Sequence, residues 1–158
     1  MKLLRISALS AICALAQIQL LEKASGLDTN LKFAMAAVIA RKEWSGFRSR
    51  LLGPELVRML GGDHRAFLIV TFAGLVIGGV LAWRLAGAFG LAVYHAGFAL
   101  LANPWFAPWD IFEPVIFTAF VIFVVESKPE SYFVTLFSVA IFNLQTAMFI
   151  PLWMIISR

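Results

Sequence analysis

Long apolar runs separated by short polar clusters dominate the sequence after residue 65. Breaks at Arg84, at the turn of residues 103–108 and at residues 127–130 divide this part of the chain. The resulting apolar segments are 66–83, 85–102, 109–125 and 131–156. Each has about the 17 to 25 residues that a helix needs to cross the hydrocarbon core of a bilayer. The pattern therefore predicts four transmembrane helices.

A further apolar run lies at the start of the chain, where Lys2 and Arg5 precede it. This arrangement predicts a first helix or signal anchor over residues 1–22, which would be a fifth span. Ala14 and Ala16 also have the small-x-small spacing of a signal-peptidase site, so cleavage after Ala16 is the alternative.

The segment 23–65 is the main polar part of the chain and lies between these two apolar regions. Its pattern predicts short amphipathic helices, one over residues 31–42 and a second that has Pro54 in its first turn. Both are too short or too charged to span a bilayer, so we expect them to lie at its interface. The residues expected to contact lipid headgroups are Arg41, Lys42, Trp44, Arg48, Arg50 and Arg58.

Composition supports a membrane location. Hydrophobic residues make up 61% of the chain and charged residues 14%, and there are 15 Phe and 5 Trp residues. Soluble domains average about 25% charged residues. The sequence thus predicts an all-α integral membrane bundle of four to five transmembrane helices with short interfacial helices, in three regions: 1–22, 23–65 and 66–158. The expected location is the bacterial cytoplasmic (inner) membrane.

The charge distribution favours membrane lipids over nucleic acid as a partner. The net charge is +4, and eight of the 13 basic residues lie between residues 22 and 65, where five acidic residues are interspersed. Interspersed acids weaken the positive field that a polyanion groove needs. The single cysteine, Cys13, excludes an intrachain disulfide and a cysteine-based zinc site.

The positive-inside rule gives two different orientations of the chain in the membrane, depending on whether residues 1–22 cross it. If residues 1–22 cross with the N-terminus inside, four basic residues lie inside and nine outside; if they do not cross, the counts are eleven and two.

Few ionisable residues fall inside the apolar segments. Arg84 is at a boundary, where its side chain can reach the headgroups. Asp110 and Glu113 lie in the first turn of the third segment, where carboxylates stabilise a helix N-terminus. His95 is near the middle of the second segment, among small residues. It packs between helices, relays a proton, or binds a metal, haem or pigment as a ligand. Because His64 lies in the polar segment, a histidine-based metal cluster is not expected.

The last apolar segment contains Asn143 and Gln145, followed by Pro151. The two amide side chains are expected to form polar contacts between helices. Pro151 is expected to kink the helix, because its ring removes a backbone hydrogen bond from the helix interior.

Three motifs together resemble a known group of proteins. They are the stretch Phe47 to Leu56, the pair Asn103-Pro104 with Pro108-Trp109-Asp110, and the stretch Asn143 to Pro151. They resemble, respectively, an aromatic-x-Arg-x-Leu-x-Pro-x-Leu signature, a Pro-Tyr-Asp turn and an Asn-Arg-Glu-Thr-Ala-x-x-x-Pro helix of certain bacterial polytopic membrane proteins. Those proteins are similar in layout to multi-spanning glycosyltransferases that use polyprenyl-linked sugars.

This resemblance implies a possible catalytic set. Asp28 would be the base, Arg48 and Arg50 would hold a phosphate, and Asp110 would line the same polar cavity. The chain departs from the motif at Leu144-Gln145, where the group has Arg-Glu. This departure favours a shortened, non-catalytic relative.

The sequence predicts an accessory or scaffold subunit of a larger inner-membrane complex, more consistent with a non-enzyme than with an enzyme. Its expected partners are membrane lipids and other membrane subunits, and no cofactor is specified. The alternatives are a glycosyltransferase-like protein that acts on lipid-linked sugars and a haem- or pigment-binding subunit through His95.

Overall fold

The computed structural model describes residues 2–24, 52–101, 111–142 and 147–157, and every regular element in these ranges is helical. The helices are α1 (Lys2–Ala24), α3 (Leu52–Met59), α4 (His64–Leu101), α5 (Phe112–Val125), α6 (Glu130–Ala140) and α7 (Phe149–Ile156). This confirms the predicted all-helical class. By length and composition, the stretches Lys2–Leu20 and His64–Gly97 could each cross a membrane.

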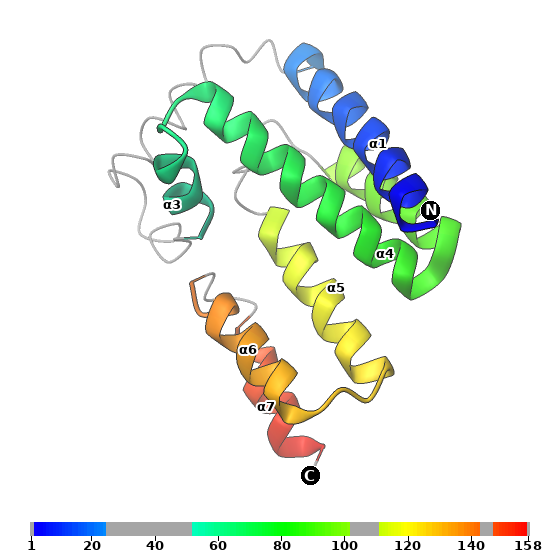
Figure 1. Cartoon of the computed structure of the whole chain (residues 1–158), viewed down its shortest axis with the longest axis vertical. Helices are drawn as coiled ribbons and strands as arrows, with labels where there is room; N and C mark the ends of the chain where they lie inside the picture. Colours follow the sequence, from blue (N-terminus) through cyan, green and yellow to red (C-terminus); the bar gives the residue numbers. More distant parts are fainter. Residues whose placement is uncertain (1, 25–51, 102–110, 143–146, 158) are drawn as a thin grey trace.

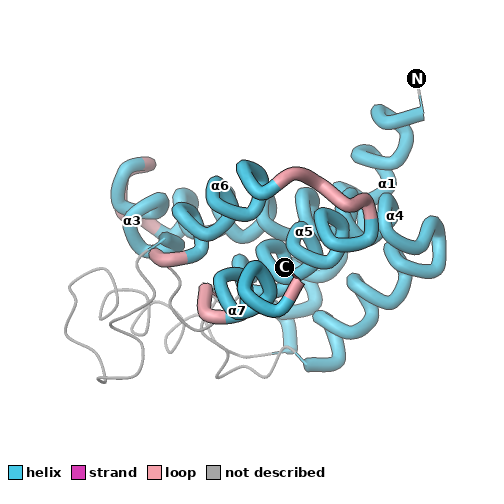
Figure 2. Tube along the Cα trace, turned by 90° about the horizontal axis from the view of Figure 1, so that it is seen from below, coloured by secondary structure: helices cyan, strands magenta, loops and turns pink. Residues whose placement is uncertain are grey.

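Helix α4 is the centre of the arrangement. It packs against α1 on one side and α5 on the other, and α3 lies near its start (Figure 1). Beyond α5, the chain adds α6 and then α7, and the view from below shows these two short helices beside α5 (Figure 2). The helices thus form a series of neighbours, α1, α4, α5, α6 and α7, in which each contacts the next.

Helix α4 is interrupted by a sharp turn. Ala86 (φ −141°, ψ 23°) and Gly87 (φ 62°, ψ −145°) leave the helical conformation. The second arm returns beside the first, so that a side-chain carbon on Gly90 would collide with the carbonyl oxygen of Ala82. The sequence placed the break between two spans at Arg84. The turn lies two residues later, because Gly87 can adopt a φ and ψ that other residues rarely reach.

Local signals set the other helix ends. The Asp63 side chain accepts a hydrogen bond of 2.7 Å from the Ala66 amide and caps the start of α4. After α5, Ser127 takes a positive φ of 50°. The Lys128 amide then bonds to the Phe123 carbonyl at 2.9 Å and the Ser127 amide to the Val124 carbonyl at 3.1 Å. These bonds satisfy the last carbonyls of α5 in a Schellman motif. The predicted break at residues 127–130 is therefore confirmed.

The predicted last span, 131–156, is wrong as a single helix. Helix α6 ends at Ala140 and α7 begins at Phe149, and the two helices pack against each other. Pro151 falls in the first turn of α7 and not in a helix interior, so its missing N–H removes no helical hydrogen bond. At about 1.5 Å per residue, helices of 11 and 8 residues are too short to cross a bilayer.

Several chain segments meet at one end of the molecule. The start of α1 lies against Trp83, and Arg84 bonds to Glu126 in the loop between α5 and α6. Glu130 at the start of α6 and Ser157 after α7 line one shared pocket. In Figure 1 these helix ends lie along the lower right side of the molecule, with the N label near the upper end of that side and the C label at its lower end.

Candidate functional site

A buried polar cluster joins α1 to both arms of α4. Ser10 and Gln17 come from α1 and His95 from the second arm of α4, and their exposed fractions are 0%, 4% and 6%. Ser10, Ala14 and Gln17 follow one another at spacings of four and three residues, so they share one face of α1. That face is the one that packs against α4, with Ala14 against Leu75 of the first arm.

The hydrogen bonds of Gln17 determine where the proton of neutral His95 sits. The Gln17 Nε2 amide donates to the backbone carbonyl of His95. A carbonyl can only accept, so the other end of this amide, Oε1, must face the ring, 2.8 Å from His95 Nδ1. Because Oε1 also can only accept, Nδ1 carries a hydrogen. The cluster thus selects the Nδ1–H tautomer.

This tautomer leaves His95 Nε2 as an acceptor for the hydroxyl of Ser10. The Ser10 Oγ atom lies 3.1 Å from His95 Nε2 and 3.1 Å from the carbonyl oxygen of Val76. One hydroxyl hydrogen serves one of these acceptors at a time. Rotation of the hydroxyl can therefore exchange the partners without moving a heavy atom.

Adjacent glycines make this close packing possible. A side-chain carbon built on Gly79 would collide with Ser10 Oγ and would lie 2.6 Å from His95 Nε2. One built on Gly78 would collide with the hydroxyl of Tyr94. The Tyr94 ring meets the His95 ring edge-on, at 5.3 Å between centroids. Small residues let membrane helices approach in this way, and here they bring α1 and both arms of α4 together.

The arrangement of serine, histidine and glutamine superficially matches a nucleophile, its base and an orienting group. Two features argue against acyl-transfer chemistry. Ser10 has no exposed surface, so a substrate carbonyl has no approach to its oxygen. The orienting group is a neutral amide, which stabilises an imidazolium less well than the carboxylate of a catalytic triad. The cluster is better suited to holding helices together.

The same hydrogen bonds bear on His95 as a ligand for haem or a pigment. An axial ligand needs one ring nitrogen free to face the metal. In this structure Nε2 faces Ser10 and Nδ1 faces Gln17, so ligation would require one of them to leave. Within the described ranges no group of three or more His, Cys, Asp or Glu residues could hold a metal ion.

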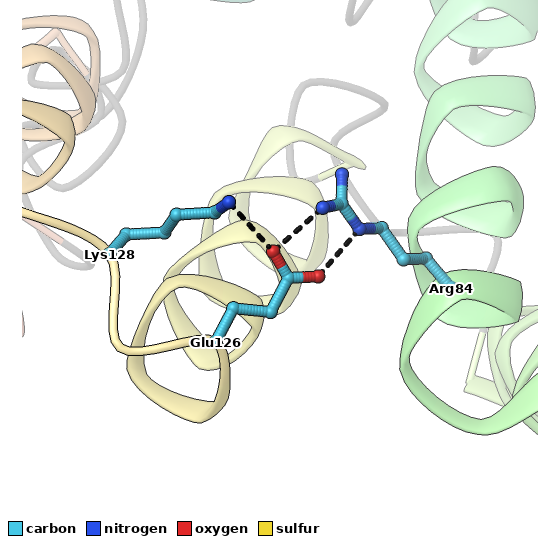
Figure 3. Close-up of polar contacts among 3 residues, drawn as sticks. All are labelled: Arg84, Glu126 and Lys128. Atoms are coloured by element: carbon cyan, nitrogen blue, oxygen red, sulfur yellow. Dashed lines mark hydrogen bonds and ion pairs between the residues drawn. The ribbon is translucent and has the colours of Figure 1, made fainter.

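A second polar cluster lies at the surface, between the turn of α4 and the loop after α5. Arg84 donates two hydrogen bonds of 2.7 Å to the two carboxylate oxygens of Glu126, and Lys128 Nζ lies 3.2 Å from Glu126 Oε2 (Figure 3). The hydrogen bond from Arg84 is the main reason that the pKa of Glu126 lies below its ordinary value. Arg84 thus ties α4 to the loop between α5 and α6, where the sequence predicted a contact with lipid headgroups.

The other predicted site residues divide into two groups. Arg58 lies on the exposed side of α3 and pairs with Glu55 at 3.2 Å, and Glu113 lies in the first turn of α5, as expected. The remainder lie outside the described residues: Asp28, Arg41, Lys42, Trp44, Arg48, Arg50, Asp110, Asn143 and Gln145.

Ser10 and Gln17 are the site residues that sequence reasoning missed. In the sequence they are two of the few polar residues in the first apolar run. The useful signal was their separation of seven residues with Ala14 between them, which gives one helix face two polar side chains and one small one. In a membrane helix such a face is expected to pack against another helix and not against lipid.

Comparison of the chain with protein-family models, with curated proteins and with solved structures finds no match in any of the three.

Proposed function

We propose that this chain is an integral protein of the bacterial inner membrane, and that it serves as a non-catalytic subunit or scaffold of a larger assembly. In the proposed topology α1, the two arms of α4 and α5 all lie across the bilayer. Helix α1 and the first arm of α4 are long enough to span the hydrocarbon core, whereas the 14 residues of α5, and the second arm of α4 of similar length, cover about 21 Å of its roughly 30 Å. The hairpin of α6 and α7 enters from one side and returns to it.

The observation that carries this proposal is the distribution of polar and apolar side chains. Phe89, Leu4 and Ile155 are 75%, 75% and 73% exposed, while Gln17 and His95 are 4% and 6% exposed. A soluble domain has the opposite arrangement, because water favours polar groups outside. Lipid reverses this preference and leaves polar groups to find partners between helices.

The second arm of α4 presents a face suited to another helix. Ala88, Ala92 and Ala96 follow at spacings of four residues and are all exposed. Exposed small side chains at this spacing allow close approach of a partner helix. This face supports a role as a subunit in addition to a membrane location.

Extraction with alkaline carbonate tests the membrane location. We expect the full chain to stay in the membrane pellet, because the helices are embedded and not held by surface charge. Release of the chain into the supernatant would contradict the proposed membrane location.

Purification from the native membrane in mild detergent tests the subunit role. We expect partner proteins in a fixed ratio, and we expect Ala92→Phe to release them because a large ring blocks close approach. Ala73→Phe is the matched control, since Ala73 is also exposed but lies on the first arm. A monodisperse, partner-free monomer would argue against the subunit role and leave the membrane location untouched.

A further inference from the structure

A groove of about 430 Å³ lies between the start of α1 and the end of the first arm of α4. Lys2, Arg5, Ile6 and Leu9 line it from α1, and Trp83 lines it from α4. The volume is within the range of about 300 to 1,000 Å³ that is usual for small-molecule sites.

Two of the residues that line this groove carry a positive charge. Lys2 and Arg5 are three residues apart, so they share one side of α1, and both are exposed. Within the described ranges, neither has a carboxylate partner. Arg84 and Lys128, at the same end of the molecule, share the carboxylate of Glu126 instead. The groove therefore has an uncompensated charge of about +2, which suits an anion.

The lining changes from polar to apolar along α1. Lys2 and Arg5 come first and Ile6 follows. At 1.5 Å per residue, Leu9 lies about 10 Å from Lys2 along the helix axis. The Leu9 side chain is 44% exposed, so the groove has apolar surface available beyond the two charged residues. Trp83 has the apolar ring and N–H donor that favour the headgroup region of a bilayer.

We infer that this groove binds one anionic phospholipid, with the phosphate between Lys2 and Arg5 and an acyl chain along Ile6 and Leu9. The inference rests on the membrane location proposed above. It adds a lipid class and a specific site to that proposal.

The other described pocket at this end of the molecule lacks these features. It has a volume of about 350 Å³ and lies beside α6 and α7. Its cation, Lys128, is paired with Glu126, and its lining includes the acidic residue Glu130. It offers no excess positive charge to a lipid phosphate.

The test is lipid binding to the purified full chain, measured by native mass spectrometry. The probes are phosphatidylglycerol and phosphatidylcholine with identical acyl chains. A lysine or arginine near a charged lipid surface contributes about fivefold in binding. We therefore expect a preference for phosphatidylglycerol of about 30-fold, which falls about fivefold in Lys2→Gln or Arg5→Gln and is almost lost in the double variant.

Lys128→Gln is the matched control, because it removes one positive charge at the same end of the molecule but outside the groove. It should keep the preference for phosphatidylglycerol. Trp83→Ala should weaken the binding of both lipids and leave their ratio unchanged, since it removes apolar surface and no charge.

Three results would overturn the inference. In the first, the double variant of Lys2 and Arg5 keeps the preference for phosphatidylglycerol. In the second, glycerol phosphate competes as well as the intact lipid, which would indicate a phosphate site without an acyl chain. In the third, Lys128→Gln loses as much preference as Lys2→Gln, which would indicate a general surface charge effect. Each can occur in a chain that resists carbonate extraction, so the two proposals fail separately.

Discussion

At the scale of single residues, buried Gln17 makes two hydrogen bonds to His95. Its amide donates to the carbonyl of His95 and accepts from the ring of the same residue, so one side chain satisfies two groups. Without Gln17, the Nδ1–H group of buried His95 would lose this partner. Unsatisfied polar groups are costly in a protein interior, and lipid offers no substitute for water.

Gln17→Leu should therefore destabilise the protein by about 1–2 kcal/mol. The measurement is equilibrium unfolding in mixed detergent micelles. Gln19→Leu is the control, because Gln19 lies on the same helix but is exposed, and we expect it to be neutral or slightly stabilising. Equal losses in the two variants would show that the buried amide has no special role.

Coupling between Gln17 and His95 can be measured separately. The double variant Gln17→Leu with His95→Leu should lose less stability than the sum of the losses in the two single variants, by about 1 kcal/mol. The reason is that either single variant already removes the hydrogen bond between the two side chains. Strict additivity of the free energies of unfolding would be inconsistent with the hydrogen bonds described here.

At the scale of elements, the turn inside α4 depends on one backbone conformation. Gly87 has φ of 62° and ψ of −145°, a region that residues with a side chain rarely enter. A side-chain carbon at this position would meet no atom within 4 Å, so any penalty comes from the backbone and not from a clash.

Gly87→Ala should destabilise the protein by about 1–3 kcal/mol. Gly97→Ala is the matched control. Gly97 is helical, and a side-chain carbon there also meets nothing within 4 Å, so the higher helix propensity of alanine should make that change neutral or stabilising. Thermal unfolding of both variants in detergent compares the two effects, and a Gly87→Ala protein as stable as wild type would contradict the assigned turn.

The link between α4 and the loop after α5 should depend on pH. The pKa of Glu126 lies below its ordinary value of 4.5 because Arg84 donates hydrogen bonds to the carboxylate. A carboxyl group whose pKa is lower in the folded state than in the unfolded state stabilises the folded protein at pH values above the unfolded-state pKa. This contribution is lost as the pH falls through the folded-state pKa. The difference in thermal stability between wild type and Glu126→Gln should thus be constant from pH 7 to about 5 and shrink below pH 4.5. A difference in thermal stability between the two proteins that grows as the pH falls below 4.5 would contradict this prediction.

Much of the helix order was predictable because apolar run lengths and turn residues are local properties. The breaks near residues 84 and 127–130 are examples. Two features were not predictable from run length: the division of residues 131–156 into α6 and α7, and the partners of His95. The sequence indicated that His95 was buried among small residues, but its contacts with Ser10 and Gln17 depend on how helices about 80 residues apart pack, which periodicity does not encode.

At the scale of the whole molecule, the described segments have two opposite ends. The start of α1, the turn of α4, the loop between α5 and α6 and the end of α7 lie toward one end (Figure 1). The end of α3 and the start of α4 lie toward the other. Under the proposed topology these ends face opposite sides of the membrane.

Single cysteines introduced into a Cys13→Ser protein test this arrangement. Ala86→Cys and Ser157→Cys should react with a membrane-impermeant maleimide from the same side of sealed vesicles, and Leu60→Cys from the opposite side. All three positions are exposed in the structure, so access depends on sidedness. Labelling of Ala86→Cys and Ser157→Cys from opposite sides would rule out a returning α6 and α7 hairpin.

The neighbouring glycines of the first arm limit which substitutions this part of the sequence can accept. Gly78 faces Tyr94 of the second arm, and Gly79 faces Ser10 of α1. A side chain at either position would therefore disrupt a different helix contact. Ile77, immediately before them, is 51% exposed. In a survey of random substitutions, we expect tolerance to change abruptly within three consecutive residues, with many apolar replacements accepted at Ile77 and almost none at the glycine pair.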